Sequence, residues 1–115
     1  MTTTLTAEDA ELMSFRIFLW LNTLDQRSAE RNSIIPTTFT CDEPRKGQRY
    51  VRVVARHNGK DAYVHAFYDQ RTGDVYKAAG WKAPAKHVRF NLLDDESFTR
   101  MIEVCDPYGS YLYIR

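Results

Sequence analysis

Two short runs of alternating residues, joined by an Asn-Gly pair, constrain the fold of this chain more than any other feature. In the runs RYVRVVAR and DAYVHAFYD, every second side chain falls on the same face of a strand. Asn58 and Gly59 between them both accept the positive φ that a type I′ hairpin turn requires. A second turn ends at Gly73 and leads into a third run, DVYKAA. The sequence therefore predicts a three-stranded antiparallel meander over residues 49 to 79.

A long helix is predicted before this meander. Thr6 precedes two acidic residues, which is typical of a capped helix N-terminus. Apolar residues then recur at helical spacing, so we expect a helix from about residue 7 to about residue 30. Its broad apolar face predicts that Phe15, Leu19 and Trp20 belong to the core.

The other segments complete an α+β pattern. Residues 37–48 are expected to form a loop or a short edge segment. Pro84 suits the first position of a helix, and VRFNLL after it is expected to form a short helix or turn. Asp94–Glu96 then cap a second helix containing SFTRMIEVC, and SYLYIR closes the chain as a strand. We expect one domain over residues 1–115, with helices on one face of an antiparallel sheet of three to four strands.

Composition limits the classes of function. The chain has 115 residues and a formal net charge of +1, so attraction to phosphate must come from a local patch. Cys41 and Cys105 match no paired metal spacing, and both are expected to be free thiols in a reducing cytosol. We expect no signal peptide, and the apolar run at 15–21 is too short to span a bilayer. We therefore expect a cytoplasmic protein without a metal or other cofactor.

One segment, TGDVYKAAGWKAPAKHVR, carries no acidic side chain between Asp74 and Asp94 but holds several cations and aromatic residues. Free backbone N–H groups at a helix beginning with Pro84 would attract an anion. Trp81 offers a flat surface on which a base can stack. The segment predicts a phosphate-binding site made of Lys77, Trp81, Lys82, Lys86, His87 and Arg89. The alternative is an ordinary solvated basic loop.

The same segment resembles a motif of small uncharacterised proteins from tailed bacteriophages. The matching positions are Thr72, Gly73, Asp74, Lys77, Ala78, Ala79, Trp81, Lys82, Ala83, Pro84, Ala85, Lys86 and Arg89. This resemblance covers about a fifth of the chain; it implies a phage origin and no particular reaction. The expected order of elements is also similar to that of double-stranded-RNA-binding domains. The paired lysines of those domains are not reproduced, and Pro84 interrupts the pattern.

Three functions remain open. The first is a non-enzymatic module that binds nucleic acid or a nucleotide through the basic segment. The second is an inhibitor or adaptor that docks on a host protein through an aromatic sheet face comprising Tyr50, Tyr63, Phe67, Tyr111 and Tyr113. The third is an enzyme acting through His65 or His87. No Ser-His-Asp, zinc-protease, P-loop or dinucleotide-binding pattern occurs in the sequence, so we expect no catalytic residues.

Overall fold

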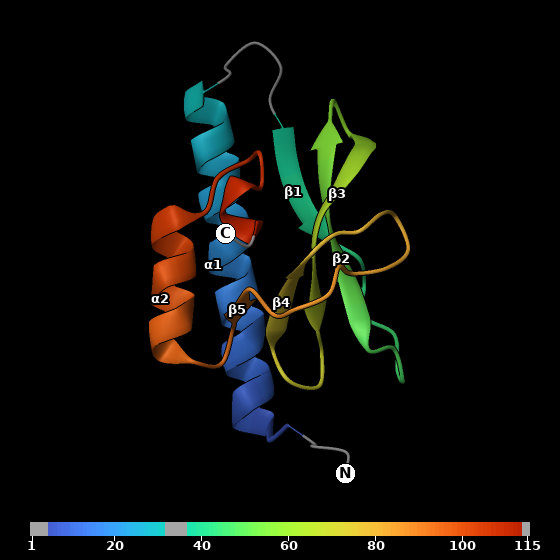
Figure 1. Ribbon diagram of the computed structural model, residues 1–115, viewed down its shortest axis with the longest axis vertical. Helices are drawn as coiled ribbons and strands as arrows, with labels where there is room; N and C mark the ends of the chain where they lie inside the picture. Colours follow the sequence, from blue (N-terminus) through green and yellow to red (C-terminus); the bar gives the residue numbers. More distant parts are fainter. Residues whose placement is uncertain (1–4, 32–36, 114–115) are drawn as a thin grey trace.

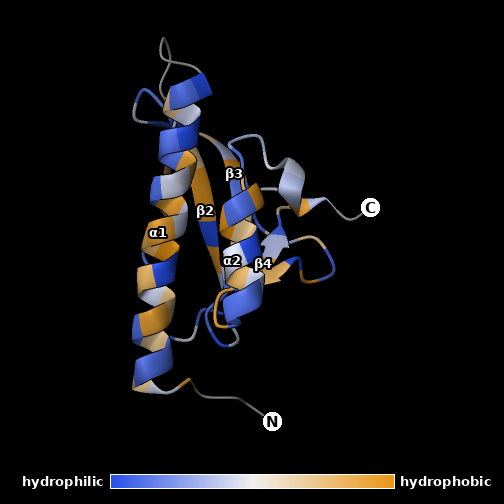
Figure 2. Cartoon of the chain, turned by 90° about the vertical axis from the view of Figure 1, so that its left-hand side faces the viewer, coloured by the Kyte–Doolittle hydropathy of each residue, from blue (hydrophilic) through white to orange (hydrophobic). Residues whose placement is uncertain are grey.

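The fold is a five-stranded antiparallel sheet with both helices on one of its faces (Figures 1 and 2). The computed structural model describes residues 5–31 and 37–113. Its elements are α1 (Ala7–Arg31), β1 (Thr37–Cys41), β2 (Tyr50–His57), β3 (Lys60–Asp69), β4 (Asp74–Lys77), β5 (Phe90–Asn91), α2 (Asp95–Val104) and the 3₁₀ helix η1 (Ser110–Leu112). The strands lie in the order β1-β2-β3-β4-β5, so each strand pairs with its neighbour in the chain. The predicted α+β class is confirmed, with more strands than expected.

The central hairpin forms as the sequence predicts. Asn58 has φ 53° and Gly59 has φ 77°, so both occupy the left-handed region that a two-residue hairpin turn demands. Gly73 has φ 82° at the second turn, which leads into β4. Alternate residues of β2 face the helices and are fully buried, namely Val51, Val53 and Ala55. Tyr50 and Arg52 therefore lie on the opposite face, which is not covered by a helix of residues 5–31 or 37–113.

Helix α1 begins and ends close to its predicted bounds. The Thr6 hydroxyl accepts a hydrogen bond from the Asp9 backbone N–H at 3.0 Å, as expected for a cap. One narrow stripe of the helix is buried against the sheet: Met13, Ile17, Trp20, Leu24 and Ser28. Trp20 is in the core, as predicted.

The prediction that Phe15 and Leu19 are core residues is wrong. Phe15 is 58% exposed and Leu19 is 36% exposed, because both lie on the side of α1 turned away from the buried stripe. Hydrophobic residues therefore also lie on the outward side of the helix, as the orange segments in Figure 2 show. A helix resting on one sheet buries one stripe, and apolar spacing alone does not say which stripe that will be.

No helix begins at Pro84, which corrects a second prediction. Pro84 instead pairs with Ala78 in an isolated β-bridge, and the Ala85 N–H donates to the Lys77 carbonyl at 2.7 Å. Further along, the Arg89 N–H donates to the Val75 carbonyl at 2.8 Å, and β5 then pairs with β4. The segment thus satisfies backbone groups at the edge of β4 that a helix would have left unpaired.

One end of the sheet agrees with expectation and the other does not, because Phe90–Asn91, predicted as part of a short helix or turn, forms strand β5. The C-terminal segment also differs from expectation. Within the range predicted as a loop or edge segment, Thr37–Cys41 forms edge strand β1. SYLYIR was predicted to form a strand, but Ser110–Leu112 is a 3₁₀ helix; residues 114 and 115 lie outside the described part of the chain. The Asp106 carboxylate bonds the Tyr108 N–H and the Ser110 hydroxyl, which builds a turn here. A turn of this kind prevents extended pairing.

Helix α2 confirms the second predicted cap. The Asp94 carboxylate accepts a hydrogen bond from the Ser97 N–H at 3.0 Å, and Asp95 and Glu96 occupy the first turn. Phe98 and Met101 are buried toward α1 and the sheet. This acidic helix start differs from the basic one that a double-stranded-RNA-binding domain would present.

Candidate functional site

The six residues predicted to form one site are separated by the structure. Trp81 and Lys82 lie beside the uncovered face of the sheet. Lys77 lies on the other side of β4, with its ammonium group 4.7 Å from the centre of the Tyr113 ring. Lys86 and His87 are exposed in the loop before β5, and His87 has a positive φ of 74°. The six residues thus form three separate groups: Trp81 with Lys82, Lys86 with His87 and Arg89, and Lys77 by itself.

The Arg89 guanidinium bonds backbone carbonyls. Its Nε donates to the Leu112 carbonyl at 2.6 Å, and its Nη1 donates to the carbonyls of Lys86 and His87. The guanidinium therefore ties the loop before β5 to the C-terminal 3₁₀ helix. Since no helix begins at Pro84, the anion-attracting helix N-terminus predicted for this segment is absent as well.

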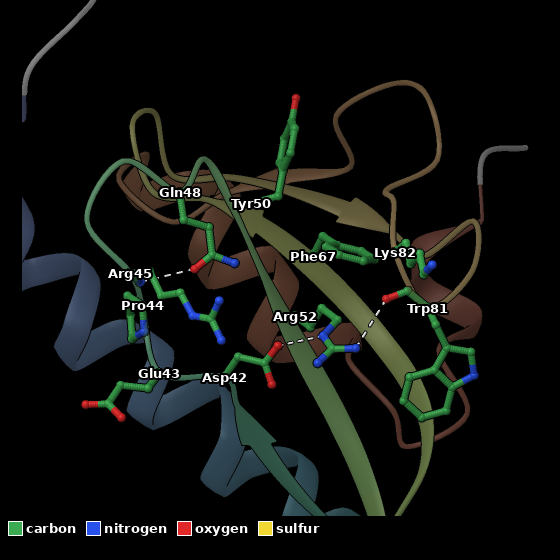
Figure 3. Close-up of a pocket in the computed structure, with 10 residues that line it drawn as sticks. All are labelled: Asp42, Glu43, Pro44, Arg45, Gln48, Tyr50, Arg52, Phe67, Trp81 and Lys82. Atoms are coloured by element: carbon green, nitrogen blue, oxygen red, sulfur yellow. Dashed lines mark hydrogen bonds and ion pairs between the residues drawn. The ribbon is translucent and has the colours of Figure 1, made fainter.

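A hollow of about 720 Å³ opens on the uncovered face of the sheet (Figure 3). We call it the outer groove. Its floor comes from β2 and β3, and its two sides are the loop after β1 and the loop after β4. It is lined by Asp42, Glu43, Pro44, Arg45, Gln48, Tyr50, Arg52, Phe67, Trp81 and Lys82.

Arg52 joins the two sides of the outer groove. Its Nε donates to the Asp42 carboxylate at 2.6 Å, and its Nη1 donates to the Trp81 carbonyl at 3.4 Å. The guanidinium carbon also lies 6.0 Å from the centre of the Trp81 ring. One side chain from the middle of the sheet thus orients both loops, as Figure 3 shows.

Aromatic surface is available at this groove. Trp81 is 46% exposed. Tyr50 packs edge-on against Tyr76 with ring centres 5.7 Å apart, and the Arg49 guanidinium lies 5.0 Å from the centre of the Tyr50 ring. A hydrogen bond and the charge of Asp69 raise the pKa of Arg49, so this cation remains charged. The uncovered face therefore combines flat rings with guanidinium groups.

The charges in the outer groove are mixed with a small cationic excess. Arg45, Arg52 and Lys82 contribute positive charge, while Asp42 and Glu43 contribute negative charge. Asp42 is neutralised by its ion pair with Arg52. The Glu43 side chain points away from the centre of the groove (Figure 3). Arg45 and Lys82 have no carboxylate partner within residues 5–31 and 37–113.

Sequence reasoning missed Arg45 and Arg52 as site residues. The alternation of β2 did place Tyr50 and Arg52 on one face, and that face is the floor of the groove. Nothing in the alternation indicated that the loops after β1 and β4 would rise on either side of it. That arrangement depends on the Arg52 bonds to Asp42 and Trp81.

The groups considered for catalysis lie elsewhere. His65 is buried, and its Nε2 lies 2.7 Å from the Tyr111 hydroxyl. Cys41 and Cys105 are free thiols whose pKa values are raised chiefly by burial. Within the described ranges, no three His, Cys, Asp or Glu side chains are grouped to hold a metal ion.

Residues 8–114 match a family model described as Family of unknown function (DUF7717). The chain belongs to this family. No curated protein and no solved structure matches it. Among the helices of the described residues, none has the length and apolar character needed to cross a membrane.

Proposed function

We propose that this protein is a non-enzymatic module that binds single-stranded nucleic acid in the outer groove. The observation that carries this proposal is the position of Trp81, whose half-exposed ring borders a groove that also contains Arg45, Arg52 and Lys82. Proteins that bind single strands combine aromatic rings, on which bases stack, with cations that follow the phosphates.

The shape of the site supports the same ligand. Its volume of about 720 Å³ lies within the range of about 300–1,000 Å³ typical of ligand sites. The groove is a trough between two loops, which suits a chain that enters at one end and leaves at the other. In this arrangement a base stacks on Trp81, while Arg45 and Lys82 contact the phosphates on either side.

The resemblance of residues 72–89 to tailed-phage proteins suggests a setting for this activity. We propose that the protein acts in the cytoplasm of an infected bacterium. Single strands arise there during genome replication and transcription. A free nucleotide is a smaller ligand that the same groove would accept.

Fluorescence anisotropy with labelled single strands, duplexes and a nucleotide tests the proposal. We expect single strands to bind more tightly than duplexes. Log affinity should fall with log salt concentration by about 0.7 for each phosphate contacted. Trp81→Ala should weaken binding by about 1–3 kcal/mol, the usual contribution of a stacked base.

The control for charge is Lys60→Glu, which makes the same charge reversal as Lys82→Glu. Lys60 is the first residue of β3, next to the hairpin turn, and does not line the outer groove. Only Lys82→Glu should reduce binding. Equal binding by Trp81→Ala, Lys82→Glu and the wild type would overturn the proposal.

A second candidate, binding to a host protein, is favoured by a different observation. The outward side of α1 exposes Phe15 at 58%, Phe18 at 61% and Leu19 at 36%. The aromatic sheet face first expected to dock a partner is not a single surface, because Phe67 is buried and Tyr111 packs in the core. Co-purification from infected cells, compared between wild type and Phe15→Ser/Phe18→Ser, tests this candidate. Loss of a specific partner in the variant would support it.

A further inference from the structure

The ring of His65 is held in one tautomer by its surroundings. Its Nε2 lies 2.7 Å from the hydroxyl oxygen of Tyr111, and the same oxygen accepts a hydrogen bond from Trp20 Nε1 at 3.0 Å. A hydroxyl that accepts from the indole still has its own proton to donate, and His65 Nε2 is the acceptor within reach. The proton of the neutral imidazole ring is therefore on Nδ1.

The ring edge that carries this Nδ1–H group faces a small pocket. His65 is 5% exposed, and burial lowers its pKa to about 4 against a smaller opposite effect of Asp106, so the ring is neutral at pH 7. The ring edge formed by Nδ1 and Cε1 faces Gly109, where a Cβ would lie 3.9 Å from Nδ1 and 3.7 Å from Cε1. No hydrogen bond to Nδ1 is found in the described part of the chain. A donor at the wall of a pocket is able to bond a molecule that enters it.

The same ring edge borders a small pocket. The pocket has a volume of about 180 Å³ and lies between β3, the end of β4 and the C-terminal turn. Besides His65 and Gly109, it is lined by the rings of Tyr63, Tyr108 and Tyr113 and by Lys77. It lies on the helix side of the sheet, because Lys77 and the neighbouring Tyr76 point to opposite faces of β4. It is therefore separate from the outer groove.

Lys77 brings a positive charge to this pocket. Its side chain is half-buried, its ammonium lies 4.7 Å from the centre of the Tyr113 ring, and its hydrogen bond to the Ala78 carbonyl is long at 3.4 Å. No carboxylate pairs with it within residues 5–31 and 37–113. The nearby Asp106 carboxylate does not line the pocket and is occupied by the Ser110 hydroxyl and the Tyr108 N–H.

We propose that this pocket binds a small oxyanion, the carboxylate or phosphate group of a ligand, between the Lys77 ammonium and the Nδ1–H of His65. One oxygen of the anion accepts the buried imidazole proton, and the charge is balanced by Lys77. Charge-assisted hydrogen bonds of this kind are stronger than neutral ones, particularly where water is excluded. The tyrosine rings form the walls around the remainder of the ligand.

Inorganic phosphate and acetate are the probes for this site. Each is titrated into the full chain at constant ionic strength, and the NMR shifts of the His65 ring nitrogens are followed. We expect the free protein to show the Nδ1–H tautomer and at least one of the two anions to shift Nδ1 in a saturable way. A response to phosphate alone or to acetate alone identifies which group the site accepts. An absence of saturable shifts with both anions would overturn the proposal, whatever the behaviour of any variant.

Lys77→Met removes the charge but retains the length of the side chain. The substitution should lower the affinity for the anion by about tenfold or more, as expected for loss of a hydrogen bond to a charged group. Lys86→Met is the matched control, because Lys86 is exposed and does not line the pocket. Equal affinity in Lys77→Met and in the wild type would show that the anion is not held by Lys77.

Discussion

Trp20 and Tyr111 lie 91 positions apart in the sequence, and the indole Nε1–H of Trp20 donates a hydrogen bond of 3.0 Å to the Tyr111 hydroxyl. The bond links the middle of α1 to the C-terminal 3₁₀ helix. The same hydroxyl also lies 2.7 Å from His65 Nε2 on β3. Burial raises the pKa of Tyr111, against an opposite effect of the Trp20 bond, so the hydroxyl stays protonated and can serve both partners.

Tyr111→Phe should therefore destabilise the protein with little loss of packing. The change leaves the Trp20 N–H and the His65 ring nitrogen without a partner, and one buried unsatisfied polar group typically costs about 1–3 kcal/mol. Denaturant unfolding followed by circular dichroism measures the free energy of unfolding. Tyr113→Phe is the control, because the Tyr113 side chain is largely exposed. If both variants are as stable as the wild type, the Tyr111 network does not contribute to folding.

The free energy of unfolding should also decrease as the pH is lowered. Burial gives His65 a pKa of about 4 in the folded protein, compared with its ordinary value of 6.5. Above pH 6.5 the ring is neutral in both states and has no pH-dependent effect. Between that pH and about 4, the unfolded chain takes up a proton that the folded chain excludes. The free energy of unfolding should then decrease by about 1.4 kcal/mol for each pH unit.

Denaturant unfolding at several pH values between 7 and 4 checks this slope, with His57→Gln and His87→Gln as controls. Both controls replace exposed histidines and should retain the slope. Asp106 contributes little to the slope between pH 7 and 4. Burial raises the pKa of Asp106, but bonds from Ser110, Tyr108 and Gly109 outweigh burial and hold it below 3.8. Its contribution is therefore lost at lower pH. A slope that survives His65→Gln would assign the effect to other groups.

Local patterns in the sequence were sufficient for part of this fold. The positive φ values of Asn58 and Gly59, and the caps at Thr6 and Asp94, depend on residues only a few positions away. The pairing of Pro84 with Ala78 depends on which backbone edge is still open once the meander has formed, and no local pattern records that.

The candidate site was predictable to a similar extent. Trp81 and Lys82 could be singled out from composition. The groove beside them could not, because it depends on Arg52 reaching a loop on each side of the sheet. Likewise, the exposure of Phe15 follows from which side of α1 meets the sheet, a property of the assembled layers rather than of the helix.

Two substitutions in α1 separate its two apolar sides. Trp20 is fully buried, so Trp20→Ala should cost about 3–5 kcal/mol of folding free energy. Phe15 is largely exposed, and Phe15→Ala should change stability by no more than about 0.5 kcal/mol. Thermal and denaturant unfolding of both variants measure the difference. A large cost for Phe15→Ala would mean that the outward side of α1 is covered in solution, for example by a second copy of the chain.

Arg89 and Lys86 were predicted to act together, yet their surroundings differ. The Arg89 guanidinium bonds three backbone carbonyls, those of Leu112, Lys86 and His87, whereas Lys86 is exposed. Arg89→Met should therefore destabilise the protein by about 1–3 kcal/mol, because the carbonyls lose a charged donor. Lys86→Met, which removes an equal charge from the same loop, should leave stability nearly unchanged. Unfolding of the two variants, together with their affinity for single strands, distinguishes the roles. If Arg89→Met retains full stability but loses nucleic-acid binding, Arg89 contacts phosphate directly and its carbonyl bonds are incidental.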